Sequence, residues 1–149
     1  MIHWYNGITL WGSTYRKYVN QLKVMQKKAV RCIYNMPYNT PTLPLFKESK
    51  LLYLNQLYEF EMGKFMKKVS NKTVPEPIQR IFTSNIDVHN HNTRRRGAPH
   101  VLHRNSVTAS TSIIHKAPMI WNRIPHAIQH IENENAYKNA LKSYILNNI

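Results

Sequence analysis

The residues of this chain with the clearest chemical capability are its cations. Lysine and arginine number 21 in 149 residues, against seven aspartates and glutamates, which leaves a formal net charge of +14. Six of these cations fall between residues 16 and 31, in a stretch without an acidic residue, and three more stand together at 94–96. Because such a surplus repels itself and attracts polyanions, the composition predicts a polyanionic partner.

Residues suited to catalysis are scarce by comparison. Asp87 is the only aspartate, which disfavours chemistry that needs several carboxylates around paired metal ions. Cys32 is the only cysteine, so it cannot form a disulfide within the chain, and its place beside Ile33 predicts a small buried hydrophobe rather than a nucleophile. The sequence also lacks glycine-rich phosphate loops and a Gly-x-Ser-x-Gly turn.

Eight histidines raise the question of a metal site. The close pairs are His89 with His91, His100 with His103, and His126 with His130. A pair of imidazoles without nearby thiolates or carboxylates rarely completes a coordination sphere. We therefore expect no metal site and no cofactor in this chain.

One strongly amphipathic helix is predicted to position the first group of cations. Apolar side chains recur at intervals of three and four along residues 15–36, and a rotation of about 100° per residue keeps them within about 60° of Leu22. They are Tyr15, Tyr18, Leu22, Met25, Ala29, Ile33 and Met36. The cations lie about 100° or more away; they are Arg16, Lys17, Lys23, Lys27, Lys28 and Arg31. The spacing predicts a helix with one face in the core and one cationic face, ended by Pro37.

Further helices are expected on either side of a polar region. Apolar residues at 51–69 predict a second helix, packed on the first as an antiparallel pair. Residues 136–145 predict a terminal helix with Asn133 or Asn135 as its N-cap. Residues 2–11 favour a short strand or an aromatic lead-in. Residues 85–105 favour a loop, with short strands expected around 100–104 and 106–109.

These elements indicate a mainly α fold: a small helical bundle with an irregular His/Arg-rich loop region and room for a short β-hairpin. We divide the chain into a helical region at 1–70, a basic loop region at 71–110 and a C-terminal helical region at 111–149, which together form one compact unit. Ile114, Met119, Ile120 and Trp121 are core candidates of the last region, where Pro118 kinks or starts a helix.

Each cationic cluster admits two interpretations. The helical cations either contact a phosphate backbone or form a solvated face, and we favour phosphate contact because an all-positive helix face repels itself. Arg94, Arg95 and Arg96 either grip phosphates with bidentate geometry or face water. Neither cluster implies recognition of base sequence, since backbone contacts position a protein without reading bases.

Five short sequence motifs occur in the same order as in a known protein family. They are Tyr5-Asn-Gly-Ile-Thr-Leu-Trp11-Gly12, Leu22-x-x-Met-Gln26-Lys27-Lys28-Ala29-Val30-Arg31, Thr42-Leu-Pro44-Leu45-Phe46, Thr93-Arg94 and Trp121-Asn122-Arg-Ile-Pro125. Over nearly the whole chain they resemble the carboxy-terminal end of LINE-type non-LTR retrotransposon reverse transcriptases of the jockey-like group. Met25 stands where that family usually has leucine, which is a conservative change.

The resemblance implies the thumb and tail of an RNA-directed DNA polymerase, with the basic helix on the template–primer phosphates. It also implies structural roles for the motif residues, which are Trp11, Gly12, Gln26, Trp121, Asn122 and Pro125. The family's palm, with its Tyr-x-Asp-Asp strand and Mg²⁺, has no counterpart in this sequence, and neither do its endonuclease and its cysteine-and-histidine knuckle. We therefore expect a truncated fragment that binds nucleic acid and does not polymerise nucleotides by itself.

A rival interpretation is an inert remnant whose apolar faces, at 51–69 or around Trp4 and Trp11, evolved to pack on the absent palm. The expected partners are an RNA or DNA template–primer and the palm of the parent polymerase, not a membrane or a small molecule. No stretch approaches the length that spans a bilayer and no leader is recognised, so we expect an intracellular protein, with no signal that names a compartment. Residence in the nucleus or the cytoplasm is implied only by the resemblance, through the life cycle of such elements.

Overall fold

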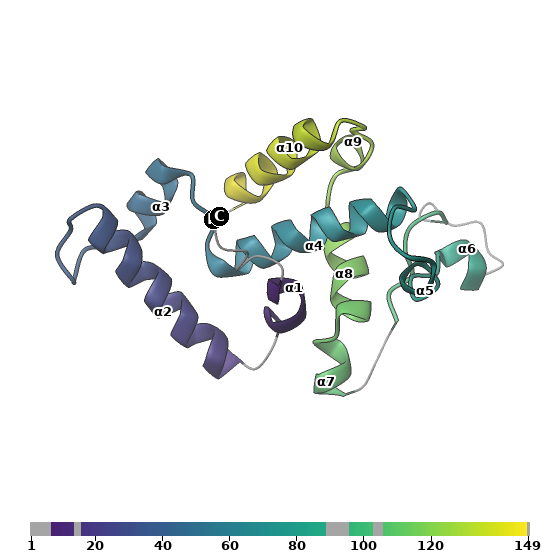
Figure 1. The fold of residues 1–149 in the computed structure, drawn as a ribbon, viewed down its shortest axis with the longest axis horizontal. Helices are drawn as coiled ribbons and strands as arrows, with labels where there is room; N and C mark the ends of the chain where they lie inside the picture. Colours follow the sequence, from purple (N-terminus) through teal and green to yellow (C-terminus); the bar gives the residue numbers. More distant parts are fainter. Residues whose placement is uncertain (1–6, 14–15, 89–95, 103–105, 149) are drawn as a thin grey trace.

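Helices make up most of the structure, a computed structural model that describes residues 7–13, 16–88, 96–102 and 106–148 (Figure 1). In chain order they are α1 (Ile8–Trp11), α2 (Arg16–Ile33), α3 (Leu43–Ser49), α4 (Leu54–Ser70), α5 (Glu76–Gln79), α6 (Asn85–Val88), α7 (Val107–Ser110), α8 (Ile113–Trp121), α9 (His126–Gln129) and α10 (Glu134–Asn147). The mainly α fold is confirmed. Within those ranges, β structure is limited to an isolated antiparallel bridge between Ser84 and Pro99.

Helix α4 is the centre of the main hydrophobic core. It packs against α8, α10 and α1, and Figure 1 shows it running through the middle of the molecule. Met62, Met66, Ala117, Tyr137 and Leu141 are at most 1% exposed where these helices meet. The core therefore joins helices from the beginning and the end of the chain, because α1 and α4 bury their apolar sides against α8 and α10.

A glycine allows α4 and α10 to approach closely. A Cβ atom at Gly63 would lie 2.7 Å from Cδ2 of Leu141, nearer than real side chains tolerate. The Tyr137 hydroxyl donates a buried hydrogen bond of 2.8 Å to the carbonyl of Gly63, which fixes the register of the two helices. The start of α10 is capped by Asn133, whose side chain accepts from the backbone of Ala136 at 3.0 Å. The N-cap expectation is thus confirmed at Asn133.

The motif residues of the C-terminal region stabilise the turn after α8. Trp121 is buried in the main core, and its carbonyl accepts a hydrogen bond of 2.7 Å from Nε2 of Gln129. The side chain of Asn122 donates to the carbonyl of Pro99 at 3.1 Å, which ties the loop before α7 to the end of α8. Pro125 is exposed and precedes α9 as its N-cap residue.

The N-terminal motif residues lie against the same core. Trp11 is half-buried and packs on the core cluster, and Ile8 is 1% exposed. A Cβ atom at Gly12 would clash with the ring of Tyr58 and with the backbone of Ile8, so only glycine fits between α1 and α4. The strand or lead-in predicted for residues 2–11 was wrong for the described part, because Ile8–Trp11 forms a helical turn that buries Ile8.

Helices α2 and α3 form a second, smaller cluster beside the main core. Its buried members are Val30, Leu45 and Phe46, and the ring of Phe46 stacks on Tyr53 with 4.0 Å between centroids. Helix α2 ends at Ile33, where Asn35 takes a left-handed conformation, so the helix stops before Pro37 is reached.

The amide of Gln26 fastens α2 to the start of α4. Its Nε2 donates to the carbonyl of Leu52 at 2.9 Å, and its Oε1 accepts from the backbone N–H of Leu54 at 3.0 Å. The N–H of Leu54 belongs to the first turn of α4 and has no partner within that helix. One side chain thus satisfies two backbone groups and holds two helices together.

Replacing Gln26 with leucine is expected to loosen α2 from the rest of the molecule. The backbone groups of Leu52 and Leu54 would lose their partners, at a cost of about 1–3 kcal/mol. Hydrogen exchange should show faster exchange of the α2 amides, while the amides of α4 and α10 stay protected. Gln21→Leu is the matched control, because Gln21 is exposed on the same helix and is expected to leave exchange unchanged.

The predicted apolar face of α2 does not enter the core. Tyr18, Met25 and Ile33 are 57%, 65% and 75% exposed, respectively. The buried side is instead that of Val19, Gln26 and Val30, rotated by about 75° from the centre of the predicted stripe. The antiparallel pairing of this stripe with residues 51–69 was therefore wrong, because those residues pack on α8, α10 and α1. Residues 15 and 149 lie outside the described part of the chain.

Two further expectations are corrected by the structure. Cys32 is exposed rather than buried, because it lies on the outward side of α2 with the stripe. The strand expected around 106–109 is replaced by the helical turn α7, which Ser106 caps by accepting from the N–H of Ala109. Residues 103–105 lie outside the described chain.

Candidate nucleic-acid interface

Helix α2 carries its cations on the side opposite the exposed stripe. Lys23, Lys27 and Arg31 follow one another at intervals of four residues, which places successive side chains about 5–6 Å apart along the helix. Lys17 and Lys28 lie beside this row, and Lys17, Lys27 and Lys28 are exposed. The row can therefore follow the charges of an extended polyanion along the helix. The side chain of Arg16 falls outside the described residues.

The lysines of α2 form no ion pair with any described residue. Over the described residues the ion pairs are local ones within α4, in or beside α5, and within α10: Lys64 with Glu61, Arg80 with Glu76 and Lys138 with Glu134. The lysines of α2 take part in none of them, and the first acidic residue along the chain is Glu48. The lysines of α2 are therefore left without an ion-pair partner among these residues and can attract an external anion.

The side chain of Arg31 already makes contacts within the protein. Its Nε donates a hydrogen bond of 2.8 Å to the carbonyl of Thr40, and its guanidinium lies 5.8 Å from the ring centroid of Tyr38. These contacts hold the loop between α2 and α3. A phosphate can meet only the remaining N–H groups of Arg31, so its contribution to binding is smaller than that of the exposed lysines.

The second predicted cluster is not adjacent to the first. Arg94 and Arg95 lie outside the described residues, and Arg96 is exposed. The backbone after Arg96 is tied to α6, where the N–H of Asn85 donates to the carbonyl of Ala98 at 3.0 Å. Figure 1 places α6 and α2 at opposite ends of the molecule. The cations of α2 and Arg96 therefore do not form one continuous binding surface.

A groove between α2, α4 and α8 gathers cations that lie far apart in the sequence. It has a volume of about 650 Å³ and runs beside the turn that follows α1. Lys23 of α2, Lys116 of α8 and Arg123 beyond α8 line it. Sequence patterns did not single out Lys116 and Arg123, because neither belongs to a cluster of cations in the sequence. Only the packing of α8 on α4 brings them toward Lys23.

The floor of this groove holds an unsatisfied hydroxyl group. The Tyr58 side chain is 8% exposed and lines the groove, and its hydroxyl makes no hydrogen bond to any described residue. Burial raises the pKa of Tyr58, and the nearby Ser13 hydroxyl opposes part of this rise without reaching hydrogen-bond geometry. Tyr58 therefore stays protonated at neutral pH, and its hydroxyl oxygen is buried beneath the groove rather than exposed in it.

Glu59 is the acidic residue that lines the groove, together with the cations. Burial raises its pKa from the ordinary 4.5, and the charge of Arg123 offsets part of that rise. A carboxyl group with a raised pKa holds its proton more tightly in the folded state than in the unfolded state. Its contribution to stability is therefore present at acidic pH and is lost as the pH rises through the pKa of the folded state.

Glu59→Gln is expected to act in two ways. The variant and the wild type should have the same free energy of unfolding near pH 4, and the variant should become the more stable protein as the pH rises to 8. Loss of the negative charge should also tighten nucleic-acid binding about twofold to fivefold at low salt. Urea unfolding across this pH range and binding to a labelled hybrid would measure the two effects. A stability difference that shrinks with rising pH would contradict the assignment.

A larger cavity lies elsewhere and is less suited to an extended anion. It measures about 960 Å³ between the end of α4, the bridge at Ser84 and Pro99, and α9. Of its cations, Lys67 donates to the carbonyl of Gln129 at 2.6 Å and lies over the ring of Tyr137, so it is used by the fold.

The described residues contain neither a cluster of metal-ligating side chains nor a membrane-spanning helix. No group of three or more histidine, cysteine, aspartate or glutamate side chains among them could hold a metal ion. The rings of His126 and His130 stack with 6.0 Å between centroids, whereas His89, His91 and His103 lie outside the described residues. None of the described helices combines the length and the apolar character that crossing a membrane requires.

The candidate interface therefore consists of the cationic side of α2 and the groove that Lys23 shares with Lys116 and Arg123. Its clustered cations are suited to attracting an anion. Comparison with known proteins adds no family to this picture: no family model matches the chain, and no curated protein or solved structure matches it either.

Proposed function

We propose that this chain binds the phosphate backbone of nucleic acid through the cationic side of α2 and the adjoining groove. The observation that carries the proposal is the set of lysines on α2 that have no ion-pair partner among the described residues. Phosphate groups would supply the missing counter-charge, and the counterions that they release would drive binding.

The form of the interface favours contact without base recognition. A row of lysines on a convex helix follows a backbone, whereas base readout needs side chains that reach into a groove and form bidentate pairs. The groove lined by Lys23, Lys116 and Arg123 offers a place where one phosphate could be held more closely. We expect binding that depends steeply on salt and little on sequence.

The resemblance to LINE-type reverse transcriptases narrows the proposal to the template–primer of an RNA-directed DNA polymerase. In that view α2 corresponds to the basic thumb helix, and this chain contributes binding rather than catalysis. The residues present do not fit the Mg²⁺ of that family, because the described carboxylates do not gather into a site and Asp87 accepts hydrogen bonds from Ser84. We assign no step through the metal.

The alternative is a remnant that packs on a polymerase palm and has no activity of its own. The face expected at 51–69 is occupied by α8 and α10, Trp11 packs on the same core, and Trp4 lies outside the described residues. Among the described residues, this alternative rests on the exposed stripe of α2. It predicts association with increasing concentration and nucleic-acid binding no tighter than net charge alone provides.

The test is the affinity of the purified chain for a short RNA–DNA hybrid, measured at several salt concentrations. An unrelated monomeric protein of equal net charge serves as the control. Tighter binding than the control, with a logarithmic slope that corresponds to about four or more phosphate contacts, supports the proposal. Binding equal to that of the control would reject it.

A further inference from the structure

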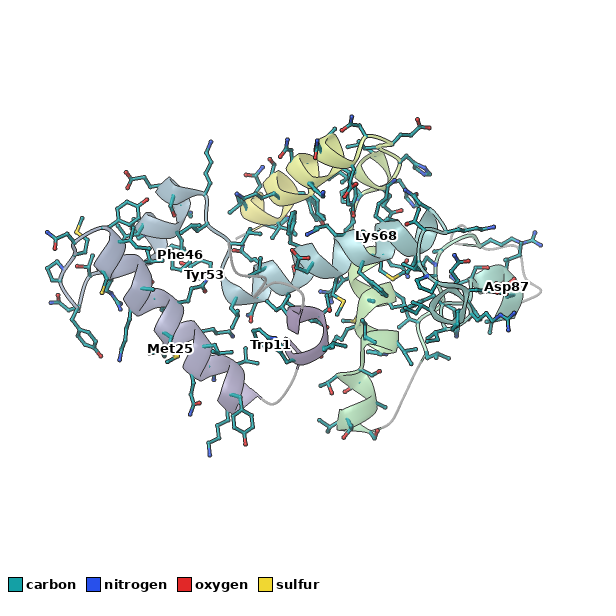
Figure 2. All side chains as sticks on the ribbon, in the orientation of Figure 1. Trp11, Met25, Phe46, Tyr53, Lys68 and Asp87 are labelled. Carbon is teal, nitrogen blue, oxygen red and sulfur yellow. The ribbon has the colours of Figure 1, made fainter. Side chains whose placement is uncertain are left out.

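The exposed apolar stripe of α2 is not explained by nucleic-acid binding. It consists of Tyr18, Leu22, Met25, Ala29, Cys32 and Ile33. Leu22 is 39% exposed and Met25 65%, although both are large apolar side chains in the middle of a helix. Figure 2 shows Met25 pointing away from the labelled core residues Phe46 and Tyr53. A run of this kind along one helix marks a surface that a partner covers.

The spacing of the stripe specifies the shape of its partner. Tyr18, Leu22, Met25, Ala29 and Cys32 follow intervals of four, three, four and three residues, which is the heptad spacing of a helix–helix seam. The stripe is narrow, because Gln21 and Lys28 border it on one side and the buried edge of α2 borders it on the other. A seam of this width takes a single helix, whereas a lipid surface favours a broader apolar face.

The charge next to the stripe specifies the sign of the partner. Lys28 lies at its border and Lys17 one step further, and α2 has no acidic residue to offset them. A second copy of this chain would place like charges against one another, in addition to a net charge of +14 on each copy. An amphipathic helix with glutamates or aspartates beside its apolar seam would meet both requirements.

We propose that the stripe of α2 is a docking surface for an acidic amphipathic helix of another protein. Leucine-like side chains of that helix would fill the positions around Ala29, where the small side chain allows close approach, and its carboxylates would pair with Lys28 and Lys17. The apolar stripe is distinct from the row of Lys23, Lys27 and Arg31, so this inference does not depend on nucleic-acid binding. Lys17 and Lys28 border both surfaces, and an acidic helix and a nucleic acid would compete for these two lysines.

Cys32 provides a direct readout, because it lies in the stripe, is exposed and is the only cysteine in the chain. Its alkylation rate in the unmodified protein reports whether the stripe is covered. The probe is a helical peptide of about three heptads, with leucine at a and d and glutamate at e and g so that its copies repel one another. At about ten times its dissociation constant, the peptide should slow alkylation about tenfold.

Substitutions separate apolar docking from charge attraction. The double variant Leu22→Ser with Met25→Ser should weaken peptide binding about tenfold or more, since it removes two apolar contacts. The control is Leu10→Ser with Val107→Ser, which alters two side chains that are 77% and 73% exposed on other helices and should bind as the wild type does. Circular dichroism and thermal melting of both variants would verify that the helices remain folded.

Four outcomes would overturn the proposal. These are no protection of Cys32 at saturating peptide, equal peptide binding by the two double variants, equal protection by a peptide with lysine in place of glutamate, and protection that rises with protein concentration alone, which indicates a second copy. Protection by phosphatidylserine vesicles without protection by the peptide would assign the stripe to a membrane surface instead. Retained hybrid binding in Leu22→Ser/Met25→Ser would show that a failure here leaves the proposed function untouched.

Discussion

Replacing Lys17, Lys27 and Lys28 together with glutamine is expected to weaken hybrid binding roughly a hundredfold near 0.1 M salt. Each phosphate contact that is lost removes about 0.9 from the slope of log affinity against log salt, so the slope should flatten by about 2 to 3. The three side chains are exposed and form no described ion pair, and glutamine preserves helix propensity. Fluorescence anisotropy with a labelled hybrid at four salt concentrations would measure both quantities.

The matched control removes the same charge from other surfaces. Lys47→Gln, Lys68→Gln and Lys72→Gln alter three exposed lysines on or next to α3 and α4 and leave α2 intact. If α2 is the interface, this variant should lose much less affinity and keep most of the wild-type slope. Equal losses in the two variants would mean that net charge alone drives binding, and the cationic side of α2 would then have no special role.

Leu141→Ala is expected to lower the free energy of unfolding by about 2–5 kcal/mol. Leu141 is completely buried, and it fills the space left by Gly63 where α10 crosses α4. Removal of its side chain would leave a cavity that the packed helices cannot close, because Tyr137 fixes their register through its hydrogen bond to Gly63. Urea unfolding should show a lower midpoint with an unchanged dependence on denaturant.

An exposed leucine provides the comparison for this core substitution. Leu10 is 77% exposed, so Leu10→Ala should change the free energy of unfolding by no more than about 0.5 kcal/mol. A small loss in Leu141→Ala would mean that α10 does not pack on α4 as described. A loss in Leu10→Ala as large as that in Leu141→Ala would also contradict the core assignment.

The sequence was sufficient to identify the main helices and their chemical character. The periodicity of apolar residues located α2, α4 and α10. Asn133 was one of two predicted caps, with Asn135, because a short polar side chain before an apolar run satisfies free N–H groups, and the structure selects Asn133. The absence of acids before Glu48 established that α2 is uniformly positive. These features are local, since each depends on residues within a few turns of one another.

Only the tertiary structure decided which side of α2 is covered. The periodicity of the sequence identifies the apolar stripe of the helix, but it carries no information about the surface of α4 on which the helix packs. Val19 and Val30 are buried, and the side chain of Gln26 lies on the same side of the helix. This side faces α4 because the Gln26 amide forms hydrogen bonds with the backbone carbonyl of Leu52 and the backbone N–H of Leu54. The more apolar side was left outward, and Cys32 with it.

The composition of the candidate site also required the fold. Lys23, Lys116 and Arg123 are distant in the sequence, and they share a groove because α8 packs across α4 next to α2. The sequence by itself determined that this protein carries a cationic, amphipathic helix and little catalytic chemistry. The tertiary structure determined where that helix is anchored and which apolar surface stays open, because burial depends on contacts between segments that no local pattern records.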